Sequence, residues 1–290
     1  MILKKEITAG VDESGRGPLF GPVVSCCVVF NDDLDVSELK DSKKISPIKR
    51  FKIFNKLIQS NIDYGIGIVN EDEIDKINVL NATKKSMLLA INSLKKKPTK
   101  LLIDGNQPLN TDIMQRTIVK GDEKIAEISA ASIIAKVTRD KIIESYSKIY
   151  PYFELNSNKG YGTKKHLEFL EIYGATSIHR KSFKPVMRYS QEKLSKFESQ
   201  IITKFAIDLI KKGIDIVEFS FKNDLSFIRY FDKGIDNLTI SVKKKHSSSL
   251  LQSFIKKNKE KDSVMKVRLN VIYSDDTSSQ NSIRKSFLIQ

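Results

Sequence analysis

The chain has 290 residues, which is enough for two domains of ordinary size. Its 50 Lys and Arg residues against 35 Asp and Glu residues give a formal net charge of +15, which indicates nucleic acid as a partner; a Lys-rich proteome with no particular partner is the alternative. The chain has no run of about 18 apolar residues, and its first ten residues lack the apolar core of a signal peptide. We therefore expect a cytoplasmic protein that does not span a membrane.

Five short strands are predicted in the first 120 residues. Residues 23–30 form a continuous run of β-branched and aromatic residues, which is typical of a buried strand. Cys26 and Cys27 are adjacent within this run, so we expect two buried apolar side chains rather than a disulfide, as in a reducing compartment. The other predicted strands are residues 7–12, 64–69, 100–103 and 115–120.

Helices are predicted between and after these strands. Residues 48–58 and 78–94 have apolar residues at helical spacing. A longer helix with an Ala-rich centre is predicted for residues 123–146, and a short one for residues 163–173. Strands that come first, with helices interleaved later, indicate a mixed α/β sheet.

A domain boundary is predicted near residue 190. The polar segment 180–193 contains Pro185 and leads into a new predicted helix, so we assign residues 1–189 to one domain and residues 190–290 to a smaller α/β domain. The second domain carries 19 basic and 12 acidic residues, a formal charge of +7. Its predicted helices are residues 192–212 and 249–257, and its predicted strands are residues 216–221, 238–242 and 267–273.

Four acids follow predicted strands, namely Asp12, Glu13, Asp104 and Asp122. In an open α/β sheet the strand ends gather at one edge, and acids gathered there repel one another unless a divalent cation such as Mg²⁺ neutralises them. Each acid also has an ordinary explanation. Asp122 could cap the helix that follows it, Asp104 could belong to an Asp-Gly turn, and the first two acids could be solvated. Spacing alone does not show that the four converge.

Six segments carry a resemblance to a known family. They read GVDESGRGPLFGPVV, DSKKIS, LLIDGN, IVKGDEKIAEISAASIIAKVTRD, GYGTKKH and HRKSFKPV, at residues 10–24, 41–46, 101–106, 118–140, 160–166 and 179–186. In this order and spacing, residues 7–189 resemble bacterial ribonuclease HII. The resemblance implies a ribonuclease H-like fold, which is a mixed five-stranded sheet with flanking helices.

The resemblance also implies an activity. The family hydrolyses the phosphodiester 5′ of a ribonucleotide and leaves a 3′-hydroxyl and a 5′-phosphate, so the expected partners are RNA–DNA hybrids and DNA duplexes with embedded ribonucleotides. The positions that match the family's catalytic, metal-binding acids are Asp12, Glu13, Asp104 and Asp122. The expected cofactor is Mg²⁺ or Mn²⁺, as two ions per site with substrate bound. We expect a monomer.

Five residues match the family's substrate contacts. The turn formed by Gly15, Arg16 and Gly17 matches the turn that reads the 2′-hydroxyl, Tyr161 matches the aromatic that stacks on the sugar beside the RNA–DNA junction, and Lys43 matches a phosphate contact. The alternatives are a tight turn without a ligand, a packing tyrosine and an exposed loop lysine. His166 and Arg180 also lie in matching segments and are expected only to support the site or touch substrate. The run SAASIIAKV in the segment at 118–140 is expected to be a buried helix face.

The C-terminal segment weakly resembles the YraN-like nuclease-fold domains. Under that resemblance Glu198 and Lys243 match metal-site residues, whereas Ser226 and Ser241 stand where carboxylates are required, so the domain would be catalytically inactive. An unrelated basic accessory domain is the alternative.

Two other functions are possible for the whole chain. A non-catalytic nucleic-acid binder on a nuclease scaffold is disfavoured because all four acids are present. The related endonuclease V group lacks the Gly-Arg-Gly and Gly-Tyr-Gly segments that this chain contains. A metal-dependent endoribonuclease is therefore the hypothesis that the sequence favours.

Overall fold

The computed structural model describes residues 6–30, 39, 45–60, 62–189, 201–220 and 225–243, together with the backbone of two strands at 267–274 and 283–289. Lys43, Glu198 and the helix predicted at 249–257 lie outside the described residues, and the side chains of Ser241 and Lys243 are not described.

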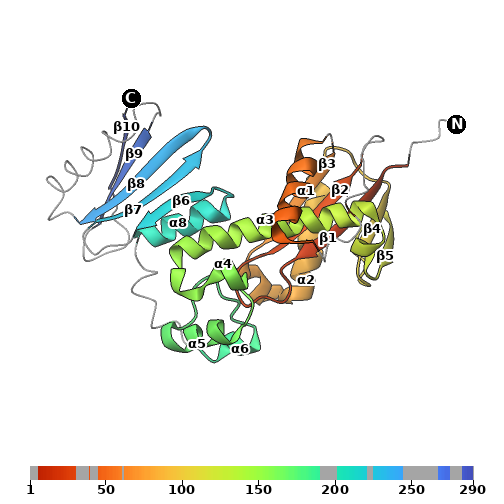
Figure 1. The fold of residues 1–290 in the computed structure, drawn as a ribbon, viewed down its shortest axis with the longest axis horizontal. Helices are drawn as coiled ribbons and strands as arrows, with labels where there is room; N and C mark the ends of the chain where they lie inside the picture. The colour runs from red at the N-terminus through yellow and green to blue at the C-terminus, as the bar shows by residue number, and fades with distance from the viewer. Residues whose placement is uncertain are drawn as a thin grey trace. The chain divides into compact units, whose positions relative to one another are not determined.

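The first sheet has five strands in the order β3-β2-β1-β4-β5 (Figure 1). Strands β1, β2 and β3 form an antiparallel meander, whereas β1, β4 and β5 run parallel. The mixed sheet predicted from the sequence is confirmed. The strands are β1 (Thr8–Ser14), β2 (Val23–Val29), β3 (Asp63–Val69), β4 (Lys100–Asp104) and β5 (Met114–Ile118).

The four predicted helices are present, but α2 and α3 have other bounds, and the short segments η2, η3, α4 and α6 were not predicted. Helix α2 begins at Glu71 rather than at residue 78, because Asn78 has a positive φ of 65° that divides a short first segment from the rest. Three acids in its first turn favour the helix N-terminus. The helical segments are α1 (Pro47–Gln59), α2 (Glu71–Asn92), η2 (Gly121–Glu123), α3 (Ala126–Ile149), η3 (Pro151–Phe153), α4 (Leu155–Asn158), α5 (Lys164–Tyr173) and α6 (Lys184–Met187).

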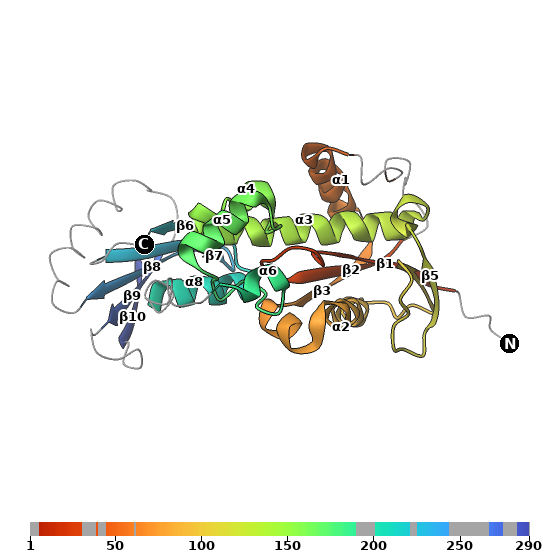
Figure 2. The same ribbon diagram turned by 90° about the horizontal axis from the view of Figure 1, so that it is seen from below.

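The first sheet lies between two helical layers (Figure 2). Successive residues of a strand point to opposite faces. Cys26 packs with α1 and α3 on one face, and Cys27 packs with α2 on the other. Both cysteines are buried and free, which confirms that they act as apolar residues. Gly67 on β3 lets α2 approach closely, since a Cβ there would overlap the Ser86 carbonyl oxygen.

A second sheet forms near the C-terminus, with strands in the order β10-β9-β8-β7-β6. Strands β6, β7 and β8 are antiparallel, β8 and β9 are parallel, and β9 and β10 are antiparallel. Helix α8 (Ile201–Lys211) contacts this sheet, and the rings of Phe205 and Tyr230 lie 5.9 Å apart. The smaller α/β domain is confirmed. The strands are β6 (Ile216–Ser220), β7 (Leu225–Asp232), β8 (Ile235–Lys243), β9 (Val267–Ser274) and β10 (Ile283–Ile289).

Strands β7 and β10 are corrections to the sequence prediction, which did not include them. Strand β7 joins β8 through a tight turn in which Lys233 and Gly234 both have positive φ. That geometry is typical of a two-residue hairpin, and the Lys-Gly pair was the signal for it. The apolar run of β7 is broken by Ser226 and Arg229, which hides its alternation.

The chain forms two compact units. The first contains residues 1–141, 159–163 and 178–188, and the second contains residues 142–158, 164–177 and 189–290. The second unit thus takes in two segments that precede residue 190, and the domain boundary at that residue stays a prediction. No helix in the described part of the chain is long and apolar enough to cross a membrane.

Candidate active site

The parallel strands bring acids to one edge of the first sheet. Val11 pairs with Ile103 in the parallel ladder of β1 and β4, so Asp12 and Asp104, the next residue of each strand, lie side by side. Asp104 in turn pairs with Ile118 of β5. Because parallel strands end at the same edge, acids that are 92 residues apart in the sequence become neighbours.

Asp122 is joined to this edge through the turn that follows β5. Lys120 adopts a left-handed conformation with φ of 56° and reverses the chain into η2. The Gly121 N–H then donates a hydrogen bond of 2.7 Å to Oδ1 of Asp104. Asp122 is the next residue, and its side chain is almost fully buried.

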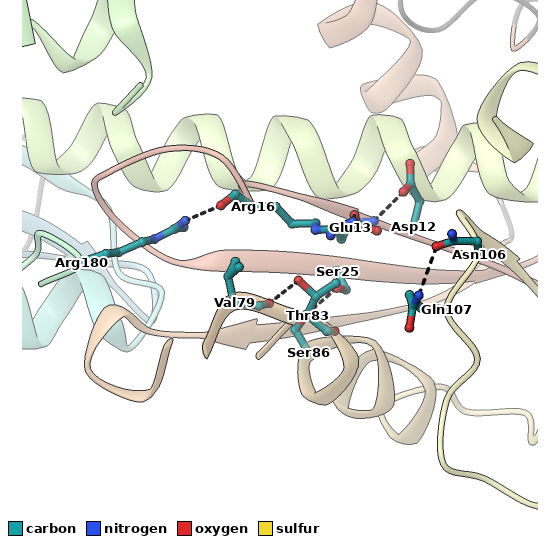
Figure 3. Close-up of polar contacts among 10 residues, drawn as sticks. All are labelled: Asp12, Glu13, Arg16, Ser25, Val79, Thr83, Ser86, Asn106, Gln107 and Arg180. Carbon is teal, nitrogen blue, oxygen red and sulfur yellow. Dashed lines mark hydrogen bonds and ion pairs between the residues drawn. The ribbon is translucent and has the colours of Figure 1, made fainter. Parts of the chain in front are cut away.

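The carboxylates at this edge are electrostatically strained. Burial raises the pKa of Asp12 well above its usual range, and the charges of Glu13 and Asp104 raise it further. Hydrogen bonds donated by the Ser132 hydroxyl and by the Glu13 N–H, the latter at 2.7 Å, oppose the rise. Burial also raises the pKa of Glu13, and the Arg16 guanidinium, 3.3 Å from Oε1, counteracts it (Figure 3). The carboxylates at this edge therefore carry negative charge that the surrounding residues compensate poorly.

The donor set fits a hard divalent cation, because every candidate ligand is a carboxylate oxygen. The side chains are not, however, arranged as a closed ligand set: among the described residues, no group of three or more His, Cys, Asp or Glu side chains is placed to hold a metal ion. Asp12, Glu13 and Asp104 each accept a hydrogen bond from a protein donor instead. An ionised carboxylate has about four acceptor positions on its two oxygens, so these hydrogen bonds leave room for a cation.

The predicted substrate turn lies beside a tyrosine. Gly15 has a positive φ of 99°, which glycine adopts without strain. A Cβ on Gly17 would lie 3.3 Å from Cε1 of Tyr161, so the Tyr161 ring faces this residue. Leu19 N donates to the Gly160 carbonyl at 2.8 Å and ties the two segments together. Tyr161 is 46% exposed and Arg16 is also exposed at the surface, so both are open to a ligand.

Comparison with known proteins agrees with this geometry. The family model for ribonuclease HII matches residues 9–186. The chain belongs to the ribonuclease HII family. It is 54% identical over 174 residues to the ribonuclease HII of Clostridioides difficile (strain 630), which covers 60% of this chain and 68% of that one. It is 47% identical over 184 residues to the ribonuclease HII of Lactobacillus acidophilus, which covers 63% of this chain and 73% of that one.

Solved structures share the fold. The crystal structure of the ribonuclease H2 from Pyrococcus horikoshii OT3 matches with a TM-score of 0.54 and 32% identity, over 66% of this chain and 99% of that one. The ribonuclease HII in the complex with PCNA from Archaeoglobus fulgidus matches with a TM-score of 0.54 at 24% identity, over 61% of this chain and 95% of that one. At this identity the match supports the fold alone. As a ribonuclease HII, the chain is a hydrolase, a ribonuclease H-type endonuclease. Its second sheet lies outside the matched residues.

The site includes polar contacts that the sequence prediction missed. The run at residues 129–137 is the buried helix face that was expected. The sequence did not indicate that its half-buried Ser132 also lowers the pKa of Asp12 through a side-chain hydrogen bond. One serine in an apolar helix gives no signal without knowing that α3 packs along the sheet. Arg139, on the same helix, is also fully buried although it is charged. His166 is fully buried against the Phe153 ring, 5.3 Å between centroids, which agrees with a supporting role.

Proposed function

We propose that the chain is a metal-dependent endoribonuclease that hydrolyses the phosphodiester 5′ of ribonucleotides in RNA–DNA hybrids and of single ribonucleotides embedded in duplex DNA, leaving 3′-hydroxyl and 5′-phosphate ends. The observation that carries the proposal is the pairing of β1 with β4, which makes Asp12 and Asp104 neighbours at an edge where burial raises the pKa of Asp12. Buried acids that face one another are characteristic of functional sites, because their mutual repulsion costs stability.

The four acids would hold Mg²⁺ or Mn²⁺, as two ions when substrate is bound. When bound, the ions supply activation of the attacking water and stabilisation of the leaving oxygen. The chain's own contribution is to keep the carboxylates ionised and oriented. Ser132 and the Glu13 N–H orient Asp12, and the Gly121 N–H orients Asp104.

The substrate surface would be the turn beside the acids. Gly15, Arg16 and Gly17 would contact the 2′-hydroxyl, the group that distinguishes RNA from DNA, and Tyr161 would stack on the adjoining sugar. The proposal is supported by the exposure of the Tyr161 ring and by its position beside Gly17, where an added Cβ would lie 3.3 Å from Cε1 of the ring. Lys43 as a phosphate contact stays a prediction.

A cleavage assay tests the proposal. A duplex with one ribonucleotide, labelled at either end, is incubated with Mg²⁺, Mn²⁺ or EDTA. We expect a single cut 5′ of the ribonucleotide with either ion, none with EDTA, and a loss of several orders of magnitude in Asp104→Asn. Asp63→Asn is the matched control, because Asp63 is a buried strand acid on β3 that lies away from the four acids. The Asp63→Asn variant should therefore keep its cleavage activity. Binding without any cleavage would instead support the non-catalytic alternative.

We propose that residues 190–290 contribute nucleic-acid binding rather than chemistry. The β7–β8 ladder pairs Ser226 with Ser241, the two positions where the weak resemblance would require carboxylates. Two serines offer no charge to hold a cation at that place, whereas the segment's formal charge of +7 suits phosphates. The cytoplasmic location and the monomeric state stay predictions.

A further inference from the structure

Two arginines lie buried under the Gly-Arg-Gly turn. Arg139 and Arg180 are both fully buried, which is costly for a permanent charge. Burial and, to a smaller extent, the charge of Arg139 lower the pKa of Arg180 to about 9, against the opposing effect of Glu71 and Asp75. Such a cost needs a compensating role, and the hydrogen bonds of the two guanidinium groups indicate what it is.

Arg180 holds the carbonyl groups of the turn. Its Nη2 donates to the Gly15 carbonyl at 2.6 Å. Its Nη1 donates to the Arg16 carbonyl at 3.0 Å, the bond drawn in Figure 3. Its Nε donates to the Gly21 carbonyl at 2.9 Å, which ties the far side of the loop to the same group. The planar fork of arginine matches three acceptors in a fixed arrangement, and lysine cannot. The guanidinium also lies over the Phe183 ring, 5.2 Å from its centroid.

Arg139 joins this turn to the segment that carries Tyr161. It donates to the carbonyl groups of Phe20 at 2.9 Å and Pro22 at 3.0 Å, and also to that of Lys159 at 3.0 Å. A Cβ on Gly15 would overlap its Nε, so the turn rests directly on this side chain. The two arginines therefore fix the turn and the tyrosine segment relative to each other.

The direction of the carbonyl groups decides which atoms a ligand meets. All peptide bonds in the described residues are trans. In a trans peptide the C=O and the following N–H point in opposite directions. Because Arg180 holds the carbonyls of Gly15 and Arg16, the N–H groups of Arg16 and Gly17 point away from it. Neither N–H has an acceptor among the described residues.

We propose that Arg180 is a positioning residue for ribose recognition: by holding two carbonyl groups inward, it presents the N–H groups of Arg16 and Gly17 as a donor pair for the 2′-oxygen. Arg139 keeps the Tyr161 ring beside that pair. The inference rests on the proposed function, because it assumes that this turn meets the ribose. A deoxyribose offers no oxygen to these donors, so the orientation of the turn sets the preference for ribonucleotides.

The test is the binding preference in EDTA, where no cleavage occurs. Affinities are measured for a duplex with one ribonucleotide and for the all-DNA duplex of the same sequence. In Arg180→Lys we expect the preference for the ribonucleotide to fall about tenfold or to vanish, the change that a loss of ~1.4 kcal/mol produces. Affinity for the all-DNA duplex and its salt dependence should not change, since the positive charges are conserved.

A matched control separates orientation from stability. Leu101→Ala removes a fully buried side chain of β4 and destabilises the same unit without touching the turn, so its preference should equal that of the wild type. If Arg180→Lys does not fold, Arg180→Ala is measured with millimolar guanidinium against the same concentration of sodium chloride. Restoration of the preference by guanidinium alone would support the inference.

The two levels of failure are distinguishable. A wild-type protein with no preference for the ribonucleotide would overturn the proposed role of the turn, and this inference with it. A wild-type preference that persists unchanged in Arg180→Lys, or an equal loss of preference in Leu101→Ala, would overturn the inference alone.

Discussion

Replacing Asp12 by asparagine should make the metal-free protein more stable while it abolishes cleavage. Asp12 is only 4% exposed, and both Glu13 and Asp104 repel its charge. Asparagine keeps an oxygen that can accept from the Glu13 N–H, so the substitution removes the charge and little else.

The direction of the effect follows from the raised pKa of Asp12. Each tenfold change in the acid dissociation constant between the folded and unfolded states is worth about 1.4 kcal/mol. The raised pKa of Asp12 therefore implies that Asp12→Asn raises the melting temperature at neutral pH. Each 1 kcal/mol gained in stability moves the melting temperature of a domain of this size by roughly 2–4 °C, so the shift is within reach of a thermal scan.

The effect should depend on pH in one direction. At low pH the Asp12 carboxyl is protonated in both the folded and unfolded states, so wild type and variant should have equal stability. As the pH rises past the unfolded-state pKa, the unfolded chain ionises first, and the wild type loses stability until the folded-state pKa is passed. The difference between the two proteins should therefore open with rising pH and then stay constant.

Thermal unfolding in EDTA, from acidic to neutral pH, measures this difference. Asp63→Asn is the control of opposite sign: Asp63 accepts hydrogen bonds from the backbone N–H groups of Lys95 at 3.2 Å and Lys96 at 2.7 Å, so the same substitution should lower the melting temperature. An Asp12→Asn melting temperature equal to or below that of the wild type at neutral pH would refute the view that this carboxylate is destabilised by its surroundings.

Two further predictions concern the substrate. Tyr161→Ala should reduce cleavage of a single embedded ribonucleotide more than cleavage of a continuous RNA–DNA hybrid, by about tenfold if one stacking contact of ~1–3 kcal/mol is lost in the transition state; equal losses would mean that Tyr161 only packs against Gly17. A chain shortened after Ser190 should cleave at nearly the full rate when saturated with duplex, yet its log-affinity should fall less steeply with log-salt because fewer lysines meet phosphates. Identical salt slopes for the long and short chains would exclude a nucleic-acid role for the extension. An insoluble short chain would instead show that the extension completes the fold, through contacts such as those of Ser145 with Asp215 and of Lys148 with Ile216.

Local patterns were enough to predict the strands and helices of the first sheet. The apolar, β-branched run at residues 23–30 is typical of a buried strand, and an acid at the end of each of two apolar runs marked Asp12 and Asp104 as candidates. Where polar residues interrupt a strand, as Ser226 and Arg229 do in β7, the alternation is masked and the strand was missed. Periodicity within one segment carries this information because it depends only on which residues face the core.

Contacts between distant segments were decided only by the tertiary structure. Nothing local to Asp12 indicates that β1 will pair with β4 in the register that makes Asp104 its neighbour, since a ladder depends on both strands. Ser132 and Arg139 lie on a helix whose sequence reads as apolar packing, and their roles follow from where α3 crosses the sheet. Arg180 is separated from Gly15 by 165 positions, and only the folded chain puts its guanidinium where two carbonyl groups of the turn can share it.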